Sequence, residues 1–174
     1  EARERSAVSI AAHSRGDDMQ GLVQHLRATG QLTAGLILRA LLSGNLDLFE
    51  SSLAELADLP LARVTALLHD RGGASVQALL IRAGFPESTF GAFRVALEVS
   101  QETGFVDTLG GAASLRRRMV ERVLTHCATD RQAAEPLLIL LRRFATESAR
   151  EEARTFCEEL VADEAFVPPT TTEA

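Results

Sequence analysis

The sequence predicts an all-α protein of stacked amphipathic helix pairs, either a HEAT-like α-solenoid or a helical bundle of about eight to ten helices. Apolar residues recur at spacings of three and four, and no segment alternates as a half-buried strand does. Glycines and prolines separate these segments, where helices end and begin. The motif Ile37–Ala40 recurs about 40 residues later as Leu80–Ala83, a period typical of HEAT-like repeats.

The first three predicted helices are separated by glycines. Residues 1–13 favour a charged, weakly apolar helix, which Gly16–Asp18 interrupts. The next helix carries an apolar residue at every third or fourth position and ends at Gly30. Thr33 suits the N-cap of the third helix because its hydroxyl can accept from a free backbone N–H, and Gly44 ends that helix.

Two of the next four predicted helices begin at a proline. A proline in the first turn costs nothing, because the N–H that it lacks has no partner inside the helix. The first helix begins with Asn45 or Asp47 as its N-cap, and the second begins at Pro60 and ends at Gly72–Gly73. The third spans residues 74–83 and ends at Gly84, and the fourth begins at Pro86 and ends at Gly104.

Three longer helices are expected after Gly110–Gly111, over residues 113–128, 131–146 and 148–164. The last of them carries an apolar stripe at helical spacing, formed by Ala149, Ala153, Phe156, Cys157, Leu160 and Val161. The chain is therefore divided into an N-terminal charged helix or arm, a helical repeat domain with a candidate subdivision near residues 104–111, and a tail or linker rich in proline and threonine. These parts span residues 1–16, 17–165 and 166–174.

Composition excludes several classes of chemistry. All 18 basic residues are arginine, so a lysine Schiff base, a phosphate-loop lysine and a Ser–Lys dyad are ruled out. The chain has no tyrosine or tryptophan, which disfavours base-stacking platforms and aromatic cages. A net charge of −6 disfavours nucleic acid as the default partner. No apolar run reaches membrane-spanning length and no secretory leader is evident, so we expect a cytoplasmic protein that does not bind a membrane.

Several motifs in the middle of the chain resemble those of the bacterial DUF2336 family, whose function is unknown. They are Gly30–Thr33, Leu38–Leu41, Gly44–Leu46, Leu48–Glu50, Leu53–Ala54, Arg82–Gly84 and Ala92–Arg94. The resemblance covers roughly residues 20–100 and carries no catalytic signature. It implies a helical, HEAT-like bacterial protein without an established activity.

The pair His69–Asp70 is a candidate metal site. It resembles the central motif of HD-domain metal phosphohydrolases, in which a His-Asp pair at a helix end binds the metal. Such an enzyme also needs an earlier histidine, for which His13 or His25 could stand, and a later aspartate, Asp107 or Asp130. We favour a helix C-terminus instead, where a histidine interacts with free carbonyls before a glycine stop, and we expect no catalytic residue, metal or cofactor.

A run of arginines over residues 116–118, together with Arg122, is a candidate phosphate contact. At 100° per residue, Arg118 and Arg122 share the polar side of the predicted helix. Arg116 falls within the apolar arc, where it must pair or extend to solvent. A solvated helix face is the favoured interpretation, and binding of a nucleic-acid backbone through Arg118 and Arg122 is the alternative.

The favoured function is a non-enzymatic helical-repeat module that binds a protein partner, because stacked helix pairs create extended binding surfaces. Homodimerisation through an apolar helix face is a further hypothesis. The alternatives are a divergent HD-type phosphohydrolase using His69–Asp70 and nucleic-acid binding through the helix over residues 113–128. Cys127 and Cys157 both fall on apolar helix faces, where cysteines are usually buried and inert.

Overall fold

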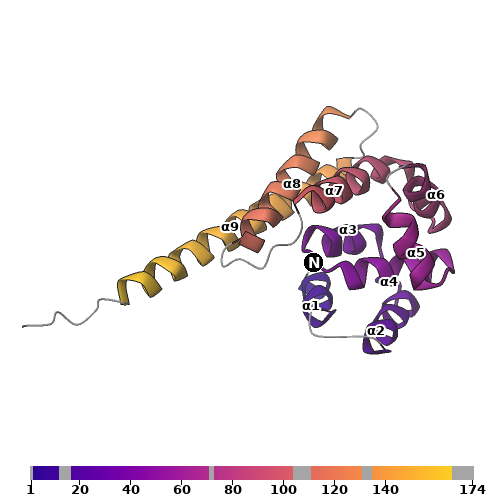
Figure 1. Ribbon diagram of the computed structural model, residues 1–174, viewed down its shortest axis with the longest axis horizontal. Coiled ribbons are helices and arrows are strands. Elements are labelled where there is room, and N and C mark those ends of the chain that lie inside the picture. The colour runs from indigo at the N-terminus through magenta and orange to yellow at the C-terminus, as the bar shows by residue number, and fades with distance from the viewer. Residues whose placement is uncertain (1, 12–16, 71–72, 104–110, 131–134, 166–174) are drawn as a thin grey trace, which may run out of the picture.

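The computed structural model describes residues 2–11, 17–70, 73–103, 111–130 and 135–165. In these ranges every regular element is a helix, which confirms the predicted all-α fold (Figure 1). The elements are α1 (Ala2–Ala11), α2 (Asp17–Ala28), α3 (Ala34–Leu42), α4 (Leu46–Ala57), α5 (Leu61–Leu68), α6 (Ala74–Arg82), the 3-10 helix η1 (Glu87–Thr89), α7 (Phe90–Thr103), α8 (Gly111–Thr129) and α9 (Glu135–Ala165).

The helices form two groups that meet mainly at α3, with a smaller contact between α6 and α7. In the first group α4 is central, because α2, α3, α5 and α6 all contact it, and α1 contacts both α3 and α4. In the second group α8 packs between α7 and α9. Helix α3 contacts α7, α8 and α9, so it joins the two groups, and the second half of α9 extends away from both (Figure 1).

The interior position of α3 follows from its sequence. Every residue over 36–42 is buried, including Arg39 in the middle of the run. A helix that is apolar on all sides must be surrounded by other elements. As predicted, Thr33 caps this helix, since its hydroxyl accepts from the backbone N–H of Leu36 at 3.2 Å. Asn45 caps α4 in the same way, accepting from the N–H of Leu48 at 3.1 Å.

The two copies of the predicted repeat, Ile37–Ala40 and Leu80–Ala83, both lie in the C-terminal part of a helix, but the first ends four residues before Gly44 and the second immediately before Gly84. Each is followed by a glycine with a left-handed φ, 77° for Gly44 and 79° for Gly84, a conformation that glycine adopts without strain. Their surroundings differ, because the first copy is buried whereas Ile81 is exposed. The arrangement fits a solenoid as well as a bundle.

One prediction about the C-terminal region was wrong. Residues 135–165 form a single helix of 31 residues, α9, rather than two helices over 131–146 and 148–164. After Pro136, in the first turn, this segment contains no glycine or proline, so nothing interrupts its hydrogen-bond ladder. Residues 131–134 lie outside the described ranges.

Two predicted helix starts shift by a few residues. Pro60 precedes α5 by one position, and Pro86 precedes η1, which in turn leads into α7. Both prolines have an extended ψ, 140° and 141°, so each lies just before its helix instead of inside it.

The predicted N-terminal arm contains α1, whose Ala7 and Ala11 are buried in the common core. Residues 12–16, 104–110 and 166–174 lie outside the described ranges, and they include most of the candidate subdivision and the predicted tail. In the part of the chain that the structure describes, no helix combines the length and the apolar character needed to cross a bilayer.

Candidate functional site

The N-terminal half of α9 contributes to the core. Leu137, Leu141, Phe144 and Ser148 are buried and follow one another at spacings of three and four residues. They therefore share one side of the helix, which faces the bundle.

A buried arginine of α3 links this helix to α9. The Nη1 group of Arg39 donates to Oε2 of Glu147 at 2.9 Å, and the side chains of the two residues are 7% and 30% exposed. The guanidinium carbon of Arg39 also lies 4.1 Å from the centre of the Phe144 ring, a cation–π contact. Sequence reasoning did not single out this contact, although a lone charge inside the apolar run over residues 36–42 was a signal for it.

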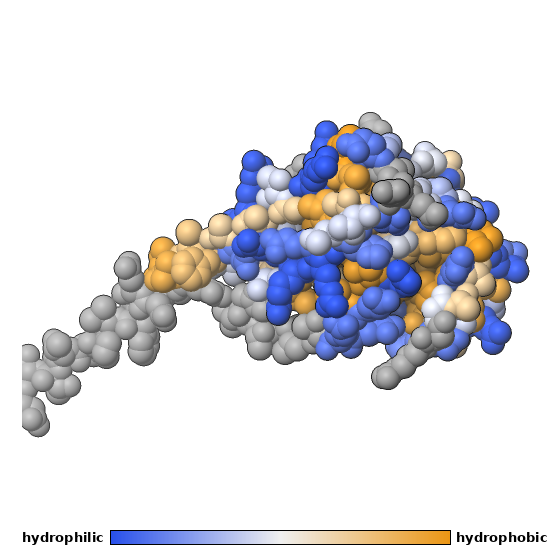
Figure 2. All heavy atoms as spheres, turned by 90° about the horizontal axis from the view of Figure 1, so that it is seen from above, coloured by the Kyte–Doolittle hydropathy of each residue, from blue (hydrophilic) through white to orange (hydrophobic). Residues whose placement is uncertain are grey.

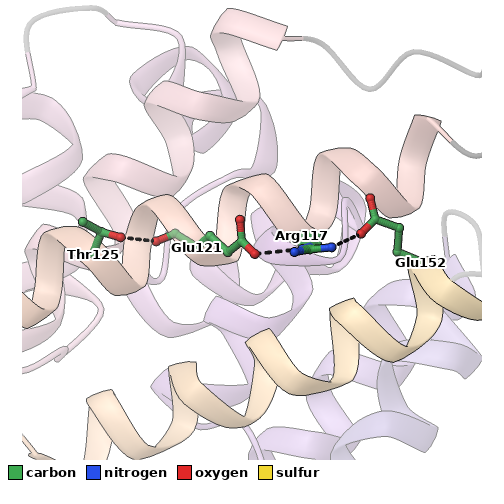
Figure 3. Close-up of polar contacts among 4 residues, drawn as sticks. All are labelled: Arg117, Glu121, Thr125 and Glu152. Atoms are coloured by element: carbon green, nitrogen blue, oxygen red, sulfur yellow. Dashed lines mark hydrogen bonds and ion pairs between the residues drawn. The ribbon is translucent and has the colours of Figure 1, made fainter.

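A second ion pair joins α8 to α9, and its arginine also pairs within α8. Arg117 donates from Nε to Glu121 at 2.8 Å and from Nη1 to Glu152 at 2.6 Å (Figure 3). These hydrogen bonds, that with Glu121 first, raise the pKa of Arg117 above its already high usual value. Among the described residues, Glu152 is the last residue of α9 that forms an ion pair with another helix.

Beyond Glu152, α9 presents an apolar surface to solvent. Phe156 is 60% exposed, Leu160 50% and Val161 68%, and Cys157 is exposed beside them. We call these four residues the α9 face. In Figure 1 this part of the helix lies outside the body of the protein, and Figure 2 shows hydrophobic colour at the projecting end.

The α9 face points away from the core-facing side of its own helix. At about 100° per residue, its four residues are centred about 160° around the axis from the buried residues of the N-terminal half. The bundle that covers one side of α9 therefore cannot also cover this face. Cys157 lies on the predicted apolar stripe, but the expectation that it is buried was wrong, because the stripe itself is exposed.

The other cysteine, Cys127, is buried as expected. Burial, followed by the nearby carboxylate of Asp130, raises the pKa of the Cys127 thiol. A higher pKa leaves less thiolate, so both burial and the raised pKa make the Cys127 thiol unreactive.

His69 and Asp70 both make contacts typical of helix ends. His69 follows α5, and its ring Nδ1 lies 2.8 Å from the carbonyl oxygen of Thr65. Asp70 accepts a hydrogen bond from the hydroxyl of Ser75, at the start of α6. In the described ranges, no three His, Cys, Asp or Glu side chains are grouped so that they could hold a metal ion. His13 and Asp107, two of the residues considered for an HD-type site, lie outside those ranges.

The arginine run spreads in three directions. Arg118 and Arg122 are exposed and line one small cavity of about 350 Å³ together with Glu121. Arg122 also pairs with Glu102 at 2.8 Å, so carboxylates offset the positive charge of this surface. Arg117 reaches α9, and the half-buried Arg116 lines a different cavity, between α3 and α9.

A comparison with models of protein families gives a match. The model of a family described as an uncharacterised protein conserved in bacteria (DUF2336) matches residues 1–133. This is more than the residues 20–100 expected from the motifs, and it includes α1 and α8 but not α9. A search of curated proteins finds no match, and a search of solved structures finds none either. Because the match spans more than half of the chain, the chain belongs to the bacterial DUF2336 family.

Proposed function

We propose that the protein is a non-enzymatic interaction module whose α9 face binds an amphipathic helix of another protein. The observation that carries the proposal is the exposure of Phe156, Leu160 and Val161 on the part of α9 that extends beyond the body. Large apolar side chains gathered on one exposed face are a common mark of a protein-binding surface.

The spacing of the α9 face favours a helix as its partner. Phe156 and Leu160 are one turn apart, so they form a ridge along the helix axis. A second amphipathic helix can pack its own apolar side chains on both flanks of such a ridge.

The charge around the α9 face indicates the chemistry of the partner. Residues 150–165 contain two arginines and six acidic residues, a net charge of −4. A partner helix whose apolar stripe is flanked by basic residues complements this charge. A second copy of α9 would bring the same acidic excess to the interface, which disfavours self-association.

The size of the α9 face favours a transient complex over a stable dimer. A fully buried aromatic side chain contributes about 200 Å², so Phe156, Leu160 and Val161 together supply less than about 600 Å². Stable interfaces bury about 800 Å² on each partner. The face is therefore suited to a reversible contact with a different chain.

The test uses two synthetic helical peptides that share one apolar stripe, flanked by lysines in the first and by glutamates in the second. The wild-type protein is expected to bind the lysine-flanked peptide more tightly, as measured by fluorescence anisotropy. Phe156→Ser with Leu160→Ser should weaken that binding about tenfold or more, because two apolar contacts are lost. Ile81→Ser, at an exposed isoleucine on α6, is the matched control and should bind like the wild type.

Two results would contradict the proposal. One is that the wild type binds the two peptides equally tightly and that the double variant binds them as tightly as the wild type does. The other is a stable dimer, seen by light scattering, that the double variant dissociates; in that case a second copy of the chain occupies the face.

A further inference from the structure

An open cavity of about 580 Å³ lies between α1, α3, α8 and α9. Its walls are apolar in part, with Val8, Leu42 and Val120 among them. Six charged side chains also line it, namely Arg39, Arg116, Arg150, Arg154, Glu147 and Glu151. None of the four residues of the α9 face lines this cavity, whose lining on α9 ends at Arg154, two residues before Phe156.

Two of these arginines have hydrogen-bond donors that nothing in the described part of the chain satisfies. In Arg39, Glu147 occupies Nη1, while Nε and Nη2 are buried without a partner. In Arg116, Nε is buried and also has no partner. An unpartnered buried donor costs about 1–3 kcal/mol, so a ligand that supplies acceptors to these N–H groups is favoured.

The cavity lining also carries an excess of positive charge. Four arginines against two glutamates give a net charge of +2. Both glutamates are already engaged, Glu147 with Arg39 at 2.9 Å and Glu151 with Arg154 at 2.6 Å. In the described ranges no ion pair involves Arg116 or Arg150, so these two guanidinium groups are available to an anion.

We infer that this cavity binds a small phosphate-bearing molecule. A phosphate dianion balances the charge of the lining and supplies the missing acceptors, and guanidinium groups match its geometry through paired N–H donors. The volume is in the range of small-molecule sites and exceeds what a bare ion fills. The apolar walls then contact the organic part of the ligand.

Isothermal titration calorimetry at low ionic strength tests this inference with two probes, inorganic phosphate and glycerol 3-phosphate. Both are expected to bind, the phosphomonoester more tightly because its organic part contacts the apolar walls. Arg150→Gln and Arg116→Gln should each weaken binding about fivefold or more, since each removes a charged hydrogen-bond donor. Arg150 is exposed, so its substitution leaves the fold intact.

The matched control is Arg142→Gln, which makes the same charge change at an exposed position of α9 outside the cavity. It should bind both probes as the wild type does. The inference is overturned if neither probe binds the wild type, or if all three variants lose affinity equally, because equal loss indicates general charge attraction. Tighter binding of inorganic phosphate than of glycerol 3-phosphate would contradict the role of the apolar walls.

Discussion

Phe93→Ala is expected to lower the free energy of unfolding by about 3–5 kcal/mol. Phe93 in α7 is fully buried and stacks on two other rings, that of Phe85 with centres 5.2 Å apart and that of Phe49 in α4 at 6.2 Å. Truncation removes both aromatic contacts and leaves a cavity that a packed core fills only in part. The three rings link α4 to α7, so the loss affects both helix groups.

Urea denaturation followed by circular dichroism measures this effect. Phe156→Ala is the matched control, because it makes the same chemical change on the exposed α9 face. The control should alter the free energy of unfolding by no more than about 0.5 kcal/mol. Equal losses in the two variants would show that Phe93 does not lie in a closely packed core.

Arg39→Ala is expected to lower the free energy of unfolding by about 2–3 kcal/mol. The substitution removes the ion pair with Glu147 and the cation–π contact with Phe144, and so loosens α9 from α3. Removing one partner of a fully buried pair costs about 3–5 kcal/mol, and the partial exposure of Glu147 reduces that value.

Two further variants separate the causes of that loss. Arg142→Ala breaks an exposed pair with Glu135 on the same helix, and its effect should stay below about 1 kcal/mol. Arg39→Met keeps most of the side-chain volume and removes the unpartnered N–H groups, so it should lose less than Arg39→Ala. If Arg39→Ala were as mild as Arg142→Ala, the ion pair with Glu147 would not anchor α9.

Local chemistry made most of the fold predictable. The hydroxyl of Thr33 and the side chain of Asn45 cap the helices that they precede, and Gly44 and Gly84 end helices in the left-handed conformation. Each of these effects acts within one helical turn, so a single sequence reveals it.

The course of α9 was harder to predict, because its apolar residues change side midway. Two apolar stripes on different sides of a helix have the same sequence periodicity as two separate helices. The backbone continues as one helix because no glycine or proline after Pro136 interrupts its hydrogen bonds. Periodicity also does not tell which stripe faces a core, so the exposure of Phe156 and Leu160 required the structure.

The charged contacts depend on positions far apart in the chain. Arg39 and Glu147 are 108 residues apart, and no local pattern relates them. Arg116 was expected to pair or to extend to solvent from within an apolar arc, and it is half-buried with an Nε that no described residue accepts from. Only the packing of α8 and α9 on α3 brings both arginines to one cavity.

The accessibility of Cys157 tests the proposed role of the α9 face most directly. In the free protein its thiol should react rapidly with an alkylating reagent, and saturating lysine-flanked peptide should slow that reaction markedly. Cys127 is the internal control, since its buried thiol with a raised pKa should stay unreacted while the protein is folded. Unchanged alkylation of Cys157 at saturating peptide, or protection of Cys157 in the free monomer, would contradict the account.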